Sequence, residues 1–91
     1  MSLVKLRKYG MNLSGRPLGI STFSIIAKEF QAPYELDLEG VVSMGSSFAD
    51  EVVAKLAKMN KESITIFNSN PIVRKCLDDV AKDKKFQILY K

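Results

Sequence analysis

The chain has 91 residues, 46% of them hydrophobic, and a formal charge of +4 from 14 basic and 10 acidic side chains. This length is near the lower limit for a self-sufficient core, so we expect one domain over residues 1–91. Because the sequence holds no histidine and one cysteine, it excludes His-dependent catalytic triads, the usual zinc sites and an internal disulfide.

No apolar run approaches the roughly eighteen residues of a membrane span. The opening segment "MSLVKLRKYG" also lacks the apolar core of a signal peptide. We therefore expect a cytoplasmic protein without a membrane partner. The lysines and arginines are scattered along the chain, whereas nucleic-acid-binding proteins gather them on one face and often interleave aromatic residues. The charge pattern thus argues against a nucleic-acid partner.

The chain opens with a predicted strand over Val4–Tyr9, in which apolar and basic residues alternate, followed by the turn-like segment "NLSGRPLG". A helix is predicted next, because large apolar residues recur at spacings of three and four. They are Ile20, Phe23, Ile26 and Phe30. Pro33 disfavours helical geometry at Ala32, so this helix should end around residues 31–33.

A second strand and a second helix are predicted in the middle of the chain. "YELDL", Tyr34–Leu38, alternates apolar residues with acids and is typical of a strand. The helix is predicted from the apolar stripe Phe48, Val52, Val53, Leu56 and Met59, and it should include residues 49–58 and end near Asn60.

The last third repeats the alternation. Ile64–Phe67, "ITIF", is a short β-branched run typical of a buried central strand. Asn70 and Pro71 are predicted as the cap and first residue of a third helix. Its apolar stripe is Val73, Cys76, Leu77 and Val80, and Phe86–Tyr90 forms the closing strand. Such alternation predicts an α/β fold with a four-stranded, mostly parallel or mixed sheet and three helices.

The segment "SMGSSFADEVV", residues 43–53, holds the most informative motif. Ser47 and Asp50 fit the pattern [ST]-x-x-[DE] that closes the start of a helix, so Ser47 is predicted to cap the second helix. The same position also suits a regulated hydroxyl, because the start of a helix favours negative charge, including a phosphoryl group. Direct contact with a partner is a third interpretation.

Two stretches of the sequence resemble a known family. "ELDLEGVVSMGSSFADEVVAKL" followed by "SITIFNSNPIVRKCLDDV" is similar to the STAS domain, named for sulfate transporters and anti-sigma-factor antagonists. The similarity is closer to a STAS-like branch of bacterial proteins. The Ser-Phe-Ala-Asp-Glu pattern of that branch is met by Ser47 to Glu51, and its upstream Gly-Arg pair is met by Gly15 and Arg16.

The resemblance implies a non-enzymatic regulatory module that binds another protein. In the antagonists, an ATP-binding kinase phosphorylates a serine of an Asp-Ser-Ser motif, and the unmodified form binds that partner. Alignment of the serine pair places the phosphorylated position on Ser47, with Ser46 beside it. The partner implied is a histidine-kinase-like ATPase or a serine kinase. Two residues depart from the antagonist motif, Gly45 where it has an acid and Phe48 where it has a glycine.

The predicted recognition surface is the loop from Gly45 to Phe48 with the outer face of the following helix. An exposed Phe48 is its expected anchor. The acids Asp50 and Glu51 belong to the same surface and would repel an added phosphate.

Two charged residues upstream are candidates for organising that loop. Asp37 lies at the end of a strand, where α/β sheets gather functional groups, and is predicted to organise the loop of Ser46 and Ser47. Arg16 is predicted to pair with Asp37 or with an anion. The alternatives are a solvated acid and an ordinary exposed arginine.

A small-ligand or nucleotide-binding module that uses the loops at the carboxyl ends of the strands is the alternative function. The sequence has neither a P-loop nor a G-x-G-x-x-G motif. It also shows no nucleophile with an adjacent base and no metal-ligand cluster. We therefore expect no enzymatic activity, no metal and no cofactor.

Overall fold

The computed structural model describes all 91 residues and contains a four-stranded parallel sheet. Its strands are β1 (Ser2–Lys5), β3 (Tyr34–Asp37), β5 (Ser63–Phe67) and β6 (Gln87–Tyr90). They lie in the order β1-β3-β5-β6, and each neighbouring pair is parallel. The predicted α/β fold is confirmed, and the sheet is parallel throughout.

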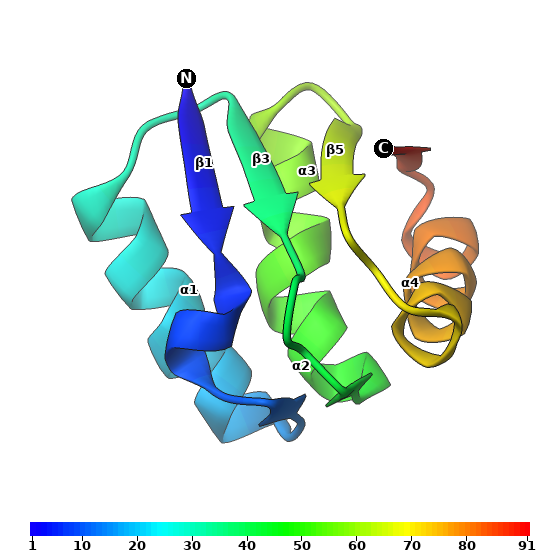
Figure 1. Cartoon of the computed structure of the whole chain (residues 1–91). Coiled ribbons are helices and arrows are strands. Elements are labelled where there is room, and N and C mark those ends of the chain that lie inside the picture. The colour runs from blue at the N-terminus through cyan, green and yellow to red at the C-terminus, as the bar shows by residue number, and fades with distance from the viewer.

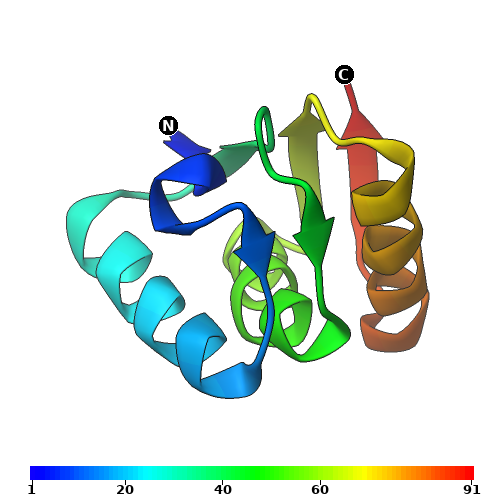
Figure 2. The ribbon, with the colours of Figure 1, turned by 60° about the horizontal axis from the view of Figure 1, so that its bottom comes forward.

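Three helices connect these strands. They are α1 (Arg16–Glu29), a continuous helix over residues 46–59, and α4 (Pro71–Lys84). The middle helix consists of α2 (Ser46–Ala49), a π-helical segment η2 (Asp50–Ala54) and α3 (Lys55–Met59). Because the strands follow one another in chain order, crossovers of one hand place every helix on the same face of the sheet. Figures 1 and 2 show this two-layer arrangement, with the other face of the sheet open.

The core lies between the sheet and the helices. Val4, Leu36 and Ile66 are buried there, whereas their sequence neighbours Lys5 and Glu35 lie on the open face and are exposed or half-buried. The period of two in the strands therefore separates a buried face from a largely polar one.

The first strand is shorter than the predicted Val4–Tyr9. It ends at Lys5, and Leu6–Tyr9 forms a 3₁₀-helix, η1. Leu6 is fully buried and Tyr9, three residues later, is half-buried, as the three-residue turn of a 3₁₀-helix requires. The alternation of apolar and basic residues over Val4–Tyr9 therefore predicted a strand where the second half is a 3₁₀-helix. A second, unpredicted parallel pair follows, in which β2 (Asn12–Leu13) pairs with β4 (Ser43–Met44).

Helix α1 begins inside the segment that was interpreted as a turn, and its buried face differs from the predicted stripe. Gly19, Thr22 and Ile26 are buried, whereas Ile20 is 53% exposed. A Cβ on Gly19 would lie 2.8 Å from Cβ of Glu51, so the missing side chain lets α1 pack closely on the middle helix. A stripe defined by large residues misses a face built on glycine and threonine.

The middle helix is confirmed over residues 49–58 but begins earlier, at Ser46. Three consecutive residues, 52–54, are buried because the helix lies between α1, α4 and the sheet. Met59, the predicted end of the apolar stripe, is 46% exposed. Helix α4 agrees with its prediction, since the Asn70 side chain accepts a hydrogen bond from the Val73 N–H at 2.8 Å.

Candidate functional site

The parallel sheet brings the chain's polar loops to one edge. The carboxyl ends of the strands lead into segments 6–15, 38–45 and 68–70, and the three helices begin directly after these segments. This carboxyl edge is the one toward which the strand arrows point in Figure 1. The loops with Asp37, Gly45 and Asn70 are therefore on the same side of the molecule, as expected for an α/β sheet.

Gly45 fixes the start of the middle helix. Its N–H donates to the Leu13 carbonyl at 2.8 Å, and its own carbonyl accepts the first helical hydrogen bond, from the Ala49 N–H at 3.0 Å. Gly45 is therefore the N-cap residue, Ser46 is the first helical residue and Ser47 the second. A Cβ on Gly45 would lie 3.2 Å from Cβ of Ser14, which leaves little room for a larger cap residue.

The prediction that Ser47 caps this helix is wrong. Its side chain makes no capping hydrogen bond, because the residue already lies inside the first turn. The [ST]-x-x-[DE] pattern placed the helix start two residues too late. At the true start, the N–H groups of residues 46–48 have no carbonyl partner within the helix and face the carboxyl edge.

Exposure separates the three residues that follow Gly45. Ser46 is exposed, Ser47 is half-buried and Phe48 is completely buried. The expectation that Phe48 is an exposed anchor is therefore wrong. Phe48 lies on the same face as Val52, four residues later, as its place in the predicted apolar stripe indicated, and the Phe48 backbone packs against Gly19 of α1.

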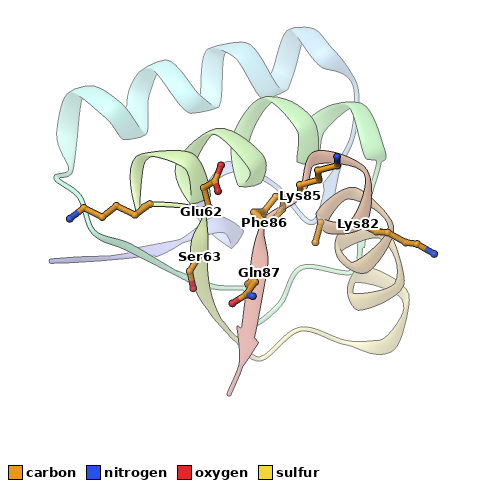
Figure 3. A pocket seen from close by; sticks show the side chains of 8 residues that line it. Glu62, Ser63, Lys82, Lys85, Phe86 and Gln87 are labelled. Atoms are coloured by element: carbon orange, nitrogen blue, oxygen red, sulfur yellow. The ribbon is translucent and has the colours of Figure 1, made fainter.

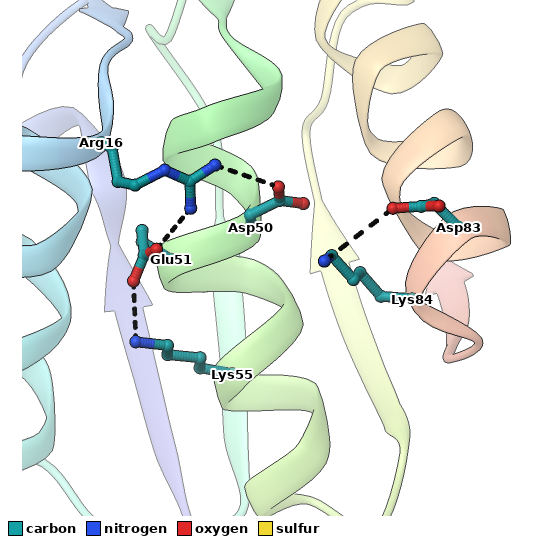
Figure 4. Close-up of polar contacts among 6 residues, drawn as sticks. All are labelled: Arg16, Asp50, Glu51, Lys55, Asp83 and Lys84. Atoms are coloured by element: carbon teal, nitrogen blue, oxygen red, sulfur yellow. Dashed lines mark hydrogen bonds and ion pairs between the residues drawn. The ribbon is translucent and has the colours of Figure 1, made fainter.

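Arg16 bridges the two acids that follow the serines. Its guanidinium contacts Asp50 at 3.5 Å and also hydrogen-bonds Glu51, and Lys55 Nζ lies 2.7 Å from the other Glu51 oxygen (Figure 4). Hydrogen bonds from Lys55 and Arg16 lower the pKa of Glu51. The expected pairing of Arg16 with Asp37 is not found, and the charge of Asp50 and Glu51 is largely offset by their basic partners.

Asp37 joins the ends of strands β3 and β5. Its carboxylate accepts hydrogen bonds from Asn68 Nδ2 at 2.9 Å and from the Glu39 N–H at 3.0 Å. The Asn68 hydrogen bond is the largest cause of a lowered Asp37 pKa. The bond to the Glu39 N–H holds the start of the segment that leads to Ser46 and Ser47, but no hydrogen bond joins Asp37 to either serine, so its organising role stays a prediction.

Asn70 holds the segment that leads to the serines. Besides capping α4, its Nδ2 donates to the carbonyls of Val41 at 3.2 Å and Val42 at 3.0 Å. The sequence indicated its capping role through the Asn-Pro pair but carried no local signal for a contact almost thirty residues away. Asn70 is thus a structural residue of the carboxyl edge that sequence reasoning underestimated.

Three exposed apolar residues lie on this edge and were not predicted. Met11 is 44% exposed, Val42 46% and Ile72 67%. Met11 and Val42 are neighbours, since the Val42 N–H donates to the Met11 carbonyl at 2.8 Å, and the side chain of Asn70, two residues before Ile72, bonds the Val42 carbonyl. With Ser46, these residues define what we call the carboxyl-edge surface.

The surface pockets lie elsewhere. The largest, about 530 Å³, is at the opposite edge, where Figure 3 shows Lys82 and Lys85 extending away from its centre. A second pocket, about 270 Å³, lies beside the Arg16, Asp50 and Glu51 network, and a third, about 410 Å³, lies beside Pro33.

Residues 23–74, more than half of the chain, match the profile of the STAS-like domain of unknown function (DUF4325). The chain belongs to this family. The matched residues include Asp37, Ser46, Ser47 and Asn70, whereas Gly15 and Arg16 lie outside them. Searches of curated proteins and of solved structures found no match. None of the helices of this STAS-like domain is both long and apolar enough to cross a membrane.

Proposed function

We propose that this STAS-like domain is a non-enzymatic regulatory module that binds a protein partner through its carboxyl-edge surface. The observation that carries the proposal is the exposed Ser46 at the start of the middle helix, on the same edge as Met11, Val42 and Ile72. Exposed apolar side chains gathered beside polar ones are typical of interaction sites. Val42 takes the role of anchor that the sequence had assigned to Phe48.

Modification of Ser46 or Ser47 would switch this surface without unfolding the domain. A phosphoryl group on either serine would meet unpaired N–H groups and the positive end of the helix dipole, which stabilise negative charge. The same group would add up to two negative charges beside an apolar contact, where desolvation is costly. The resemblance to the antagonists makes an ATP-binding serine kinase the proposed partner.

Capture from native lysate tests the interaction, and the chain offers a matched control. Val42 and Met59 are each 46% exposed, but Met59 lies at the opposite edge of the sheet. Val42→Lys should lose a protein that both the wild type and Met59→Lys retain. If the two variants recover the same proteins as the wild type, or lose them equally, the carboxyl-edge surface is not the recognition site.

Phosphosite mapping tests the switch separately. Mass spectrometry of the protein from its native cell should find phosphate on Ser46 or Ser47, and the corresponding Ser→Asp variant should weaken partner capture. Asp at these positions suits the first turn of a helix, so the variant should remain folded. If no phosphate is found and both Asp variants capture the partner as the wild type does, the proposed phosphorylation switch is contradicted. The proposed partner binding is not affected by that result.

Isothermal titration with nucleotides separates this proposal from the ligand-binding alternative. The proposal predicts no saturable heat with ATP or GTP for the isolated domain. If a nucleotide binds saturably and Val42→Lys weakens that binding, the carboxyl-edge loops form a nucleotide-binding site instead.

A further inference from the structure

The outer face of helix α1 is uncharged along most of its length. From Pro17 to Ala27, no residue carries a charge. A helix on the surface of a globular protein normally has charged residues on its solvent side, as α4 has. On α1, by contrast, Leu18 is 36% exposed, Ile20 53% and Ile25 41%.

The exposed residues of α1 form two apolar ridges. Gly19, Thr22 and Ile26 face the middle helix, so at about 100° per residue the opposite side centres on Ser21 and Ser24. Beside the line through Ser21 and Ser24, Ile20 and Ala27 form one ridge. Leu18 and Ile25 form the other ridge, on the opposite side of that line. In Figure 1, α1 forms the outer edge of the helical layer, where no other element covers it.

We propose that this face of α1 packs against α1 of a second copy, antiparallel, about a two-fold axis. In a two-fold interface, residue i of one copy meets residue j of the other, and j meets i, so the surface must match its own reversed pattern. The α1 face does so about its midpoint. Leu18 faces Ile25, Ile20 faces Ala27, and Ser21 faces Ser24 at the crossing point.

Charge also favours the antiparallel arrangement with a second copy. A parallel arrangement would place the exposed Lys28 beside the Lys28 of the other copy. The antiparallel one separates the two Lys28 side chains by most of the length of the helix. The positive and negative ends of the two helix dipoles also become neighbours.

The contact should be weak. A helix of 14 residues is about 21 Å long. One face of it buries less than the roughly 800 Å² per partner of a standard stable interface. We therefore expect monomers and dimers in concentration-dependent exchange. This surface is separate from the carboxyl-edge surface, so either proposal can fail alone.

Sedimentation equilibrium from about 10 μM to about 1 mM tests the proposal, since weak complexes dissociate in this range. The wild-type mass should rise from 10.2 kDa toward twice that value. Ser21→Lys/Ser24→Lys should remain monomeric because like charges meet at the crossing point. Ser21→Lys/Ser24→Glu should dimerise again, because each Lys then faces a Glu. Circular dichroism confirms that each variant is folded.

Leu89→Lys is the matched control, because Leu89 lies outside both proposed surfaces and is 53% exposed, like Ile20. It should dimerise like the wild type. A wild type that stays monomeric throughout would overturn the proposal. So would a Lys/Lys variant that dimerises like the wild type, a Lys/Glu variant that stays monomeric, or an equal loss of association in Leu89→Lys.

Discussion

Gly19 of α1 lies against the backbone of Phe48, where an added Cβ would be 3.2 Å from the Phe48 Cα. This contact holds α1 on the middle helix and covers the face that carries Phe48. The opposite side of the same helical turn then presents Ser46 to solvent. Gly19, which lies outside the family match, thereby lets α1 cover one side of the Ser-Ser-Phe segment.

Gly19→Ala should lower the free energy of unfolding by up to about 2 kcal/mol, which is the usual overpacking cost of about 1–3 kcal/mol less the gain in helix propensity. Alanine is the better helix former by about 1 kcal/mol, so a loss of stability reports the close packing and not helix propensity. Ser21→Ala, on the exposed face, is the control and should change stability by less than about 0.5 kcal/mol. Denaturant unfolding measures both. A Gly19→Ala protein more stable than the wild type by about 1 kcal/mol would contradict the close packing, because only the gain in helix propensity would then remain.

Asn70→Ala should destabilise the protein by about 1–2 kcal/mol, because it removes a helix cap. The loss of its two hydrogen bonds to the segment before β4 should add to that cost. Ser47→Ala should cost less than about 0.5 kcal/mol, since Ser47 makes no capping bond. Thermal or denaturant melts compare the two. If Ser47→Ala were the more damaging change, the assignment of Gly45 as the cap residue would be incorrect.

The carboxyl group of Asp37 should titrate below its ordinary pKa of 3.8, mainly because Asn68 donates to it. A lowered folded-state pKa means that this contribution to stability is present above the unfolded-state pKa and is lost as pH falls through the folded-state value. NMR titration should show the Asp37 midpoint rising in Asn68→Gly. Glycine tolerates the positive φ of 60° at this position, so the variant removes the hydrogen bond without straining the turn. An unchanged midpoint would contradict this cause.

Periodicity in the sequence predicted the alternation of strands and helices, because buried strands such as Ile64–Phe67 and amphipathic helices such as α4 carry their pattern locally. The helix starts were harder to place. Gly15 and Gly45 cap α1 and α2 without any side-chain signature, and the polar pattern around Ser47 suggested a later start. The exposure of Phe48 was expected from its place in the antagonist-like loop, whereas the apolar stripe that it forms with Val52 correctly indicated burial.

The site was only partly predictable for a related reason. Ser46 and Ser47 are recognisable from the motif, but their neighbours on the carboxyl edge come from distant segments. The contacts of Asn70 with Val42, of Asn68 with Asp37 and of Arg16 with Glu51 each join residues at least twenty-eight positions apart. The sequence pattern places each residue near a strand end or helix start, and only the packing of α1 and α4 beside the middle helix decides the partners.

The central claim is tested most directly by the Kd of the captured partner for the purified Val42→Lys and Met59→Lys domains. Each value is compared with the Kd for the purified wild-type domain. A buried interface anchor is worth about 2 kcal/mol or more, so Val42→Lys should raise Kd at least about 30-fold. Met59→Lys, equally exposed but at the opposite edge, should leave Kd within about twofold. A larger loss for Met59→Lys, or equal affinities for both variants, would contradict the claim that the carboxyl-edge surface binds the partner.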